Sequence, residues 1–148
     1  MSSTTTYSAK EITISFAGAL IDGGFGDGEF LRIESEADDT TDVAGTAGDV
    51  AVSPNNDDRA TVTLTLMQTS EQNDVLSAIR AAGRATPAGV AIGPLFVADR
   101  LGRSLWEGAA AWIQRPPIVS LDRGATSREW VLRVANLRRT DGGNVRLE

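Results

Sequence analysis

The sequence predicts a mainly β protein: an antiparallel β-sandwich or barrel with one flanking α-helix at about residues 70–82. Three observations support this prediction. Segments of alternating apolar and polar residues recur along the chain, and a period of two is that of a strand with one buried face. Turn-forming residues separate these segments. Only one stretch changes to helical spacing, so the βαβ rhythm of a parallel sheet is missing.

The clearest strand opens the run RATVTLTLMQTSEQNDVLSAIRAAG, residues 59–83. Its side chains alternate between an apolar face and a threonine face. This pattern is typical of an antiparallel strand with one face in the core and the other in water. The apolar face comprises Val62, Leu64 and Leu66, and the threonine face comprises Thr61, Thr63 and Thr65.

The same run continues as the amphipathic helix. Thr69 is predicted to cap its N-terminus, with Gln72 reaching back to complete the cap. Apolar residues then recur at helical spacing. Gly83 follows the last of them, where a left-handed helix end favours glycine. The helix is expected to stop there, since Pro87 follows shortly afterwards.

Six further strands are expected. The first lies within Lys10–Leu20, where isoleucine and phenylalanine alternate with Glu11, Thr13 and Ser15. A hairpin turn is predicted at Asp99–Arg103. The other strands are expected at Phe30–Glu34, Asp49–Val52, Ala91–Ala98, Ser104–Gln114 and Arg128–Leu137.

Residues 1–148 are expected to form a single domain with an acidic extended loop at about 35–48. The loop has few apolar residues to bury, so we expect it to be mobile in the free subunit. Residues 1–58 hold twelve acidic and two basic residues, a net −10, whereas residues 59–148 hold eight acidic and twelve basic residues, a net +4. An acidic surface of one subunit can therefore meet a basic surface of the next. Two solvated charge groups that never meet are the alternative.

Thirteen of the fourteen basic residues are arginines, and Lys10 is the only lysine. Arginine suits fixed, bidentate pairing with carboxylates at interfaces, although an arginine-rich codon usage explains the same bias.

The composition argues against an enzyme. Cysteine and histidine are absent, which removes thiolate metal sites and the commonest general base. The glycine-rich segment at 23–28 lacks the lysine and the helix of a phosphate-binding loop, and the acidic loop lacks the ligand spacing of a calcium site. We therefore expect no catalytic residue, cofactor or metal. No apolar run approaches the length of a membrane span, so we also expect no membrane anchor and synthesis in the cytoplasm.

Three segments carry a resemblance to a known family: YSAKEITISFAGALIDG, NNDDRATVTLTLMQTSEQNDVLSAI and REWVLRVANLRRTDGGN. They resemble the tail tube proteins of tailed bacteriophages, particularly contractile-tailed ones. The resemblance implies a homo-oligomer in which six subunits form a ring, and rings stack into a hollow tube that conducts the genome. It also implies a sheath outside the tube, baseplate or initiator and terminator proteins at its ends, and a place in the virion tail after assembly in the host cytoplasm.

A channel for DNA should repel phosphate and avoid basic side chains, since each phosphate contact slows passage. The candidates for lining the lumen are Glu11, Thr13, Ser15, Thr61, Thr63 and Thr65, and an ordinary solvent-facing sheet is the alternative. The acidic loop is predicted to order when one ring docks on the next. The inter-ring contact candidates are Asp38, Asp39, Asp42, Arg138, Arg139 and Arg146.

Two other interpretations remain open at this point. A tube protein of a bacterial contractile injection or secretion system follows the same ring logic. A calcium- or carbohydrate-binding β-sandwich module would instead use the acidic loop as its binding site, and the absence of a signal sequence counts against it.

Overall fold

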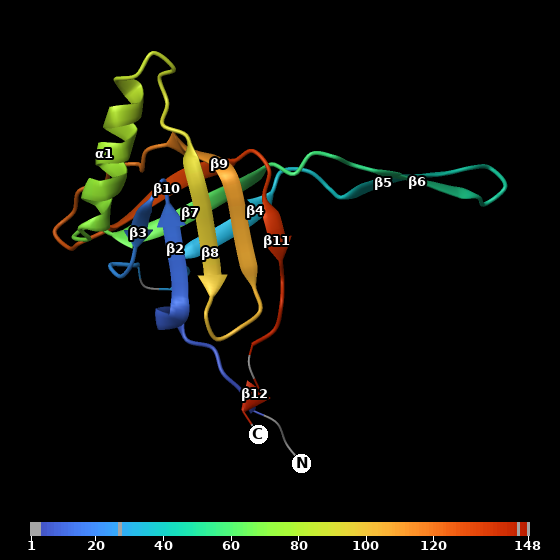
Figure 1. The fold of residues 1–148 in the computed structure, drawn as a ribbon, viewed down its shortest axis with the longest axis horizontal. Coiled ribbons are helices and arrows are strands. Elements are labelled where there is room, and N and C mark those ends of the chain that lie inside the picture. Colours follow the sequence, from blue (N-terminus) through green and yellow to red (C-terminus); the bar gives the residue numbers. More distant parts are fainter. Residues whose placement is uncertain (1–3, 27, 145, 148) are drawn as a thin grey trace.

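The computed structural model describes residues 4–26, 28–144 and 146–147. Within these ranges the chain forms twelve strands, one α-helix and one short 3₁₀-helix (Figure 1). They are β1 (Thr4–Thr5), η1 (Ala9–Glu11), β2 (Ile12–Phe16), β3 (Ala19–Ile21), β4 (Leu31–Ser35), β5 (Thr40–Ala44), β6 (Val50–Pro54), β7 (Ala60–Met67), α1 (Gln72–Arg84), β8 (Gly93–Asp99), β9 (Leu105–Arg115), β10 (Ser127–Val134), β11 (Arg138–Thr140) and β12 (Arg146–Leu147). The predicted mainly β class, with antiparallel strands and one flanking helix, is confirmed.

The main sheet has the strand order β3-β2-β8-β9-β10-β7-β4, with β11 added beside β9. It curls over so that β2 and β8 cross in front of β7 and β10 (Figure 1). The long strand β9 passes from one layer to the other, and register shifts in both of its long pairings accompany this bend. The core between the layers includes Ile14, Phe16, Ile21, Val62, Leu64, Leu66, Leu76, Leu95, Val97, Trp130, Leu132 and Val134.

Burial along β7 follows the predicted alternation. Val62, Leu64 and Leu66 are at most 2% exposed, whereas the three threonines that alternate with them, Thr61, Thr63 and Thr65, are half-buried. The burial of an apolar face that recurs every second residue stabilises the strand and fixes its register. The predicted apolar and threonine faces of this strand are confirmed.

The first predicted strand is two strands, because the chain reverses at Ala17 and Gly18. Both residues have positive φ, 53° and 84°, as a tight two-residue hairpin turn requires. Gly18 adopts this conformation without strain. At Ala17, the backbone amide donates to the carbonyl oxygen of Pro94 at 2.8 Å. The prediction of one strand over Lys10–Leu20 was therefore wrong at its C-terminal end.

The helix begins at Gln72 and ends at Arg84, two residues later at each end than predicted. Thr69 does not cap it; the hydroxyl of Ser70 accepts the Gln72 amide at 3.2 Å instead. The side chain of Gln72 donates to the carbonyl oxygen of Asp22 at 3.4 Å rather than completing a capping box. Within the described residues, no helix is long and apolar enough to cross a membrane.

Gly83 lies inside the helix and does not form a left-handed end, which corrects the second capping prediction. A Cβ atom placed there would lie 2.2 Å from the amide nitrogen of Ala91. Glycine is needed because the backbone of the segment before β8 passes directly against α1.

The predicted acidic loop is in fact a β-hairpin that projects from the body on the side opposite α1 (Figure 1). Residues 40–44 form strand β5, which pairs with β6 so that Thr40 lies opposite Pro54 and Ala44 lies opposite Val50. Between the strands, the amide of Gly45 donates to the carbonyl oxygen of Asp49 at 2.7 Å. The prediction of an extended loop at about 35–48 missed strand β5 at Thr40–Ala44, because β-branched residues on both strands allow backbone pairing without a core. Residues 36–58 are called the arm below.

Candidate assembly surfaces

The base of the arm is held to the body by Arg139 on β11. Its Nη1 donates to the Ser35 hydroxyl at 3.0 Å, while Nε and Nη2 bind the Asp141 carboxylate at 3.0 and 3.1 Å. The indole of Trp106 also donates to Asp141, at 3.0 Å. The hydrogen bonds from Arg139 and then from Trp106 lower the pKa of Asp141, so this carboxylate is ionised and oriented. The arm therefore leaves the body in a defined direction.

Two further carboxylates form ion pairs at the base of the arm: Glu36 contacts the body, and Asp57 makes a local pair on the returning segment. Glu36 accepts a hydrogen bond from Thr61 and pairs with Arg133 at 3.1 Å. The Thr61 hydrogen bond is the largest cause of a lowered Glu36 pKa, and the charge of Arg133 adds to it. On the returning chain, Arg59 binds both oxygens of Asp57 at 2.9 and 2.8 Å, which lowers the Asp57 pKa.

Beyond this base, the arm is exposed on both faces. Val43, Val50 and Val52 are 67%, 60% and 63% exposed, although an isolated two-stranded hairpin is only marginally stable in water. Five arm carboxylates have no ion-pair partner among the described residues: Asp38, Asp39, Asp42, Asp49 and Asp58. Clustered apolar side chains beside unpaired charges mark this arm as a candidate contact surface.

Within one subunit, the acidic and basic inter-ring candidates do not come together. Asp38 and Asp39 precede β5, and Asp42 lies within it. Arg138 is 85% exposed and pairs loosely with Glu107 at 3.9 Å. Arg139 is engaged at the base of the arm, and the side chain of Arg146 lies outside the described part of the chain.

The structure places five of the six lumen candidates on two different sheet faces. Thr13 and Ser15 lie on β2, whereas the three threonines lie on β7. The apolar sides of both strands enter the same core from opposite layers, so their polar sides point away from each other. Glu11 is not on a strand; it ends η1 and pairs with Arg100 at 3.7 Å. One subunit can therefore present only part of the predicted set to a single channel.

The face around the β7 threonines carries paired charges. Arg32 on β4 lies opposite Thr63 and binds Glu29 at 2.7 Å. Arg133 on β10 lies opposite Thr61 and pairs with Glu36. Two more glutamates, Glu34 and Glu129, are exposed and lie in register with Thr61 and Thr65. Arg115, which lies opposite Val131, borders the same face and has no ion-pair partner among the described residues. The described side chains of this threonine face therefore combine hydroxyls, two neutralised arginines, one unpaired arginine and an excess of carboxylates.

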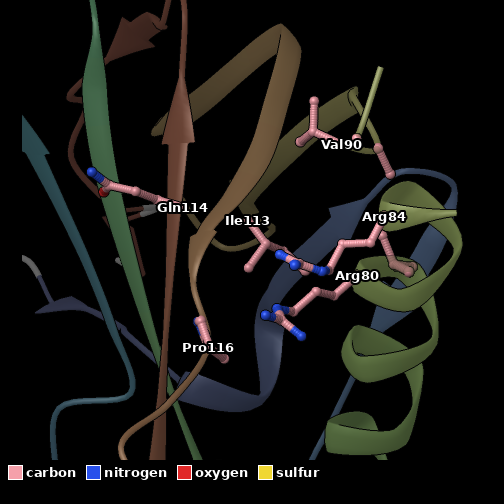
Figure 2. Close-up of a pocket in the computed structure, with 9 residues that line it drawn as sticks. Arg80, Arg84, Val90, Ile113, Gln114 and Pro116 are labelled. Carbon is pink, nitrogen blue, oxygen red and sulfur yellow. The ribbon is translucent and has the colours of Figure 1, made fainter. Parts of the chain in front are cut away.

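A small cleft separates α1 from β9 (Figure 2). Its volume is about 100 Å³, and Ile79, Val90 and Ile113 contribute its apolar lining. Arg80 and Arg84 extend from α1 across this cleft toward β9. The sequence analysis did not single out these arginines, although their spacing of four residues places them on one helix face.

The described residues contain no group of three or more acidic side chains placed to hold an ion. Three surfaces are the candidates considered for assembly: the arm, the threonine face and the α1–β9 cleft. All three are suited to contact with other macromolecules.

No protein-family model matches the chain. Over 146 residues it is 28% identical to "Structural protein ORF10" of Pseudomonas phage KPP10, and the match covers 95% of this chain and 84% of that protein. Among solved structures, its fold is similar to a chain of the anti-feeding prophage cap, a tube-terminating cap, with a TM-score of 0.58 and 9% sequence identity. The match covers 93% of this chain and 92% of that chain. Two assemblies of the PVC extracellular contractile injection system also match with TM-scores of 0.56. One is the sheath/tube terminator, at 14% identity and coverage of 92% and 97%; the other is the sheath-tube complex, at 12% identity and coverage of 91% of each chain.

The resemblance to contractile-tail proteins is confirmed. The relative by sequence is a phage structural protein, and the relatives by fold belong to the tube, sheath and cap assemblies of contractile injection machines. The prediction of a structural protein rather than an enzyme is likewise confirmed by these relatives.

Proposed function

We propose that this protein is a subunit of a phage tail tube, in which hexameric rings stack into a hollow conduit for the genome. The observation that carries the proposal is the asymmetry of the fold: a projecting arm on one side and a separate cleft on the other (Figure 1). Contact between two different surfaces is heterologous, and repetition of such a contact builds rings or open filaments rather than closed dimers. The 28% identity to a phage structural protein supports the same role.

In this role the virion tail is the site of the protein, with a sheath outside the tube and initiator and terminator proteins at its ends. The arm is proposed to contact the next ring through Asp38, Asp39 and Asp42. DNA passes through the lumen without specific binding. A phage-derived injection machine would use the same subunit architecture.

The threonine face of β7 is proposed to line the lumen. Its hydroxyls and its excess of carboxylates disfavour phosphate contact, and Arg32 and Arg133 are neutralised by neighbouring glutamates, whereas Arg115 has no ion-pair partner among the described residues. The β2 face is proposed to lie outside the channel, since the neighbouring Leu20 and Phe96 are 55% and 39% exposed and suit a protein contact. This proposal keeps Thr61, Thr63 and Thr65 and sets aside Glu11, Thr13 and Ser15.

Cysteine labelling tests the lumen assignment, because the native chain contains no cysteine. In assembled tubes, a Thr63→Cys variant is expected to react with a small maleimide but not with a polymer-linked maleimide too wide for the channel. Thr13→Cys is the matched variant on β2 and should not show that size selectivity. If Thr63→Cys reacts with the bulky reagent, or reacts with neither reagent, the assignment is contradicted.

Negative-stain microscopy of the purified protein over a range of high concentrations tests the function itself. Hollow tubes of stacked rings are the expected result. A protein that forms neither rings nor tubes at any concentration would refute the proposal.

A second candidate function is that of a tube terminator, which closes the end of a tube with one ring. The specific observation in its favour is the fold similarity to a tube-terminating cap and to a sheath/tube terminator. In the same images, single rings that do not stack would support the terminator over the tube subunit.

A further inference from the structure

The α1–β9 cleft carries two arginines that lack acidic partners. None of the ion pairs among the described residues includes Arg80 or Arg84. Both side chains reach toward Ile113 and Pro116 on the far wall of the cleft (Figure 2). A guanidinium group has five donors in a fixed plane and binds carboxylates with high geometric selectivity. An acidic group at the mouth of the cleft would therefore pair with these two arginines.

The size and lining of the cleft restrict its occupant further. A volume of about 100 Å³ accommodates one or two side chains and no helix. The apolar contributions of Ile79, Val90 and Ile113 favour an aliphatic side chain inside. The occupant should thus present an aliphatic residue directly beside a carboxylate.

The arm presents this combination. Asp42 on β5 is paired with Val52 on β6, and partners in an antiparallel pair point to the same face. The pair Ala44–Val50 lies two positions along and shares that face. Both valines are mostly exposed, and Asp42 has no ion-pair partner among the described residues.

The arm cannot fill the cleft of its own subunit. Figure 1 shows it projecting from the side of the body opposite α1, and its base is fixed there by Arg139 and Glu36. The occupant must therefore come from another molecule.

We propose that the arm of one subunit docks in the α1–β9 cleft of a neighbouring subunit, with Asp42 pairing with Arg80 and Arg84 and Val52 entering the apolar interior. This inference rests on the proposed function, because the neighbour is taken to be a second copy in the tube. It assigns the cationic partner of the arm to Arg80 and Arg84 in place of the predicted Arg138, Arg139 and Arg146. The contact is head-to-tail, so each subunit gives one arm and receives another.

Charge reversal tests the pairing. The double variant Arg80→Glu/Arg84→Glu is expected to raise the protein concentration needed for assembly by about tenfold or more, since truncated or reversed charge pairs weaken interfaces strongly. The matched control Arg103→Glu/Arg123→Glu makes the same change in net charge at two exposed arginines that lie outside the cleft and form no ion pair among the described residues, so it should assemble as the native protein does. Adding Asp42→Arg to the cleft variant should restore assembly. Circular dichroism confirms that each variant is folded.

Crosslinking provides a test that does not depend on tube formation. A mixture of Val52→Cys and Pro116→Cys proteins should form a disulfide-linked heterodimer under mild oxidation, because only the introduced cysteines are present. A mixture of Val52→Cys and Arg138→Cys is the control and should not.

The possible results separate the two proposals. Normal assembly of the cleft variant, or absence of the Val52–Pro116 crosslink, overturns the docking proposal and leaves the tube function intact. If the Val52→Cys and Pro116→Cys proteins form the crosslink while the native protein forms neither rings nor tubes, the docking contact is supported and the tube function is overturned.

Discussion

Replacing residues 40–54 with Asn-Gly is expected to abolish tube assembly while leaving the subunit folded. The new ends are already adjacent, since the amide of Asn55 donates to the carbonyl oxygen of Asp39 at 2.7 Å. Asn-Gly favours the tight turn that joins them. Every residue removed is exposed and none belongs to the core, so we expect the melting temperature to change by less than about 2 °C. Thermal melting by circular dichroism and negative-stain microscopy measure the two effects.

The matched control shortens the arm without removing its strands. Replacing residues 45–49 with Asn-Gly keeps β5 and β6 in their native pairing and keeps Asp42 beside Val52. This variant should assemble as the native protein does. Tubes formed by the armless variant would show that the arm is not needed for assembly, and a large loss of its melting temperature would show that the arm supports the fold.

The parts of the fold that the sequence predicts are those set by side-chain periodicity. Strand β7 has an apolar side chain at every second position, and this pattern alone determines which face is buried. The hairpin turn at Asp99–Arg103 is also present, with the amide of Gly102 donating to the carbonyl oxygen of Asp99 at 3.1 Å. The side chain of Asp99 reinforces it by accepting from the amide of Leu101 at 3.0 Å. These features are local, so local sequence contains them.

The parts that were mispredicted depend on contacts between distant segments or on backbone pairing without burial. The strand β5 carries no buried residue, so neither hydrophobic pattern nor composition distinguishes it from a loop. The separation of Thr13 from Thr63 follows from the curl of the sheet, which no single strand specifies. The α1–β9 cleft likewise brings Arg80 to Pro116 across 36 positions, and this proximity exists only in the folded chain.

Gly83 shows how a local rule can name an important residue and give the wrong reason for it. If Gly83 were simply an interior helix position with free space, any residue of better helix propensity would stabilise the protein. Because a Cβ atom there would lie 2.2 Å from the backbone nitrogen of Ala91, we expect the opposite. Gly83→Val should lower the free energy of unfolding by about 3 kcal/mol and the melting temperature by roughly 10 °C, the usual result of overpacking a tight contact.

Ser77→Val is the matched control for Gly83→Val, because it places the same β-branched side chain on an exposed position of the same helix. It carries the propensity cost of valine without the collision, so its effect should be no more than about 0.5 kcal/mol. Chemical denaturation of both variants measures the difference. Equal effects would mean that the segment before β8 moves aside at little cost. The close contact between Gly83 and Ala91 would then not be what holds this segment, and Val90 with it, against α1 beside the cleft that we propose receives the arm.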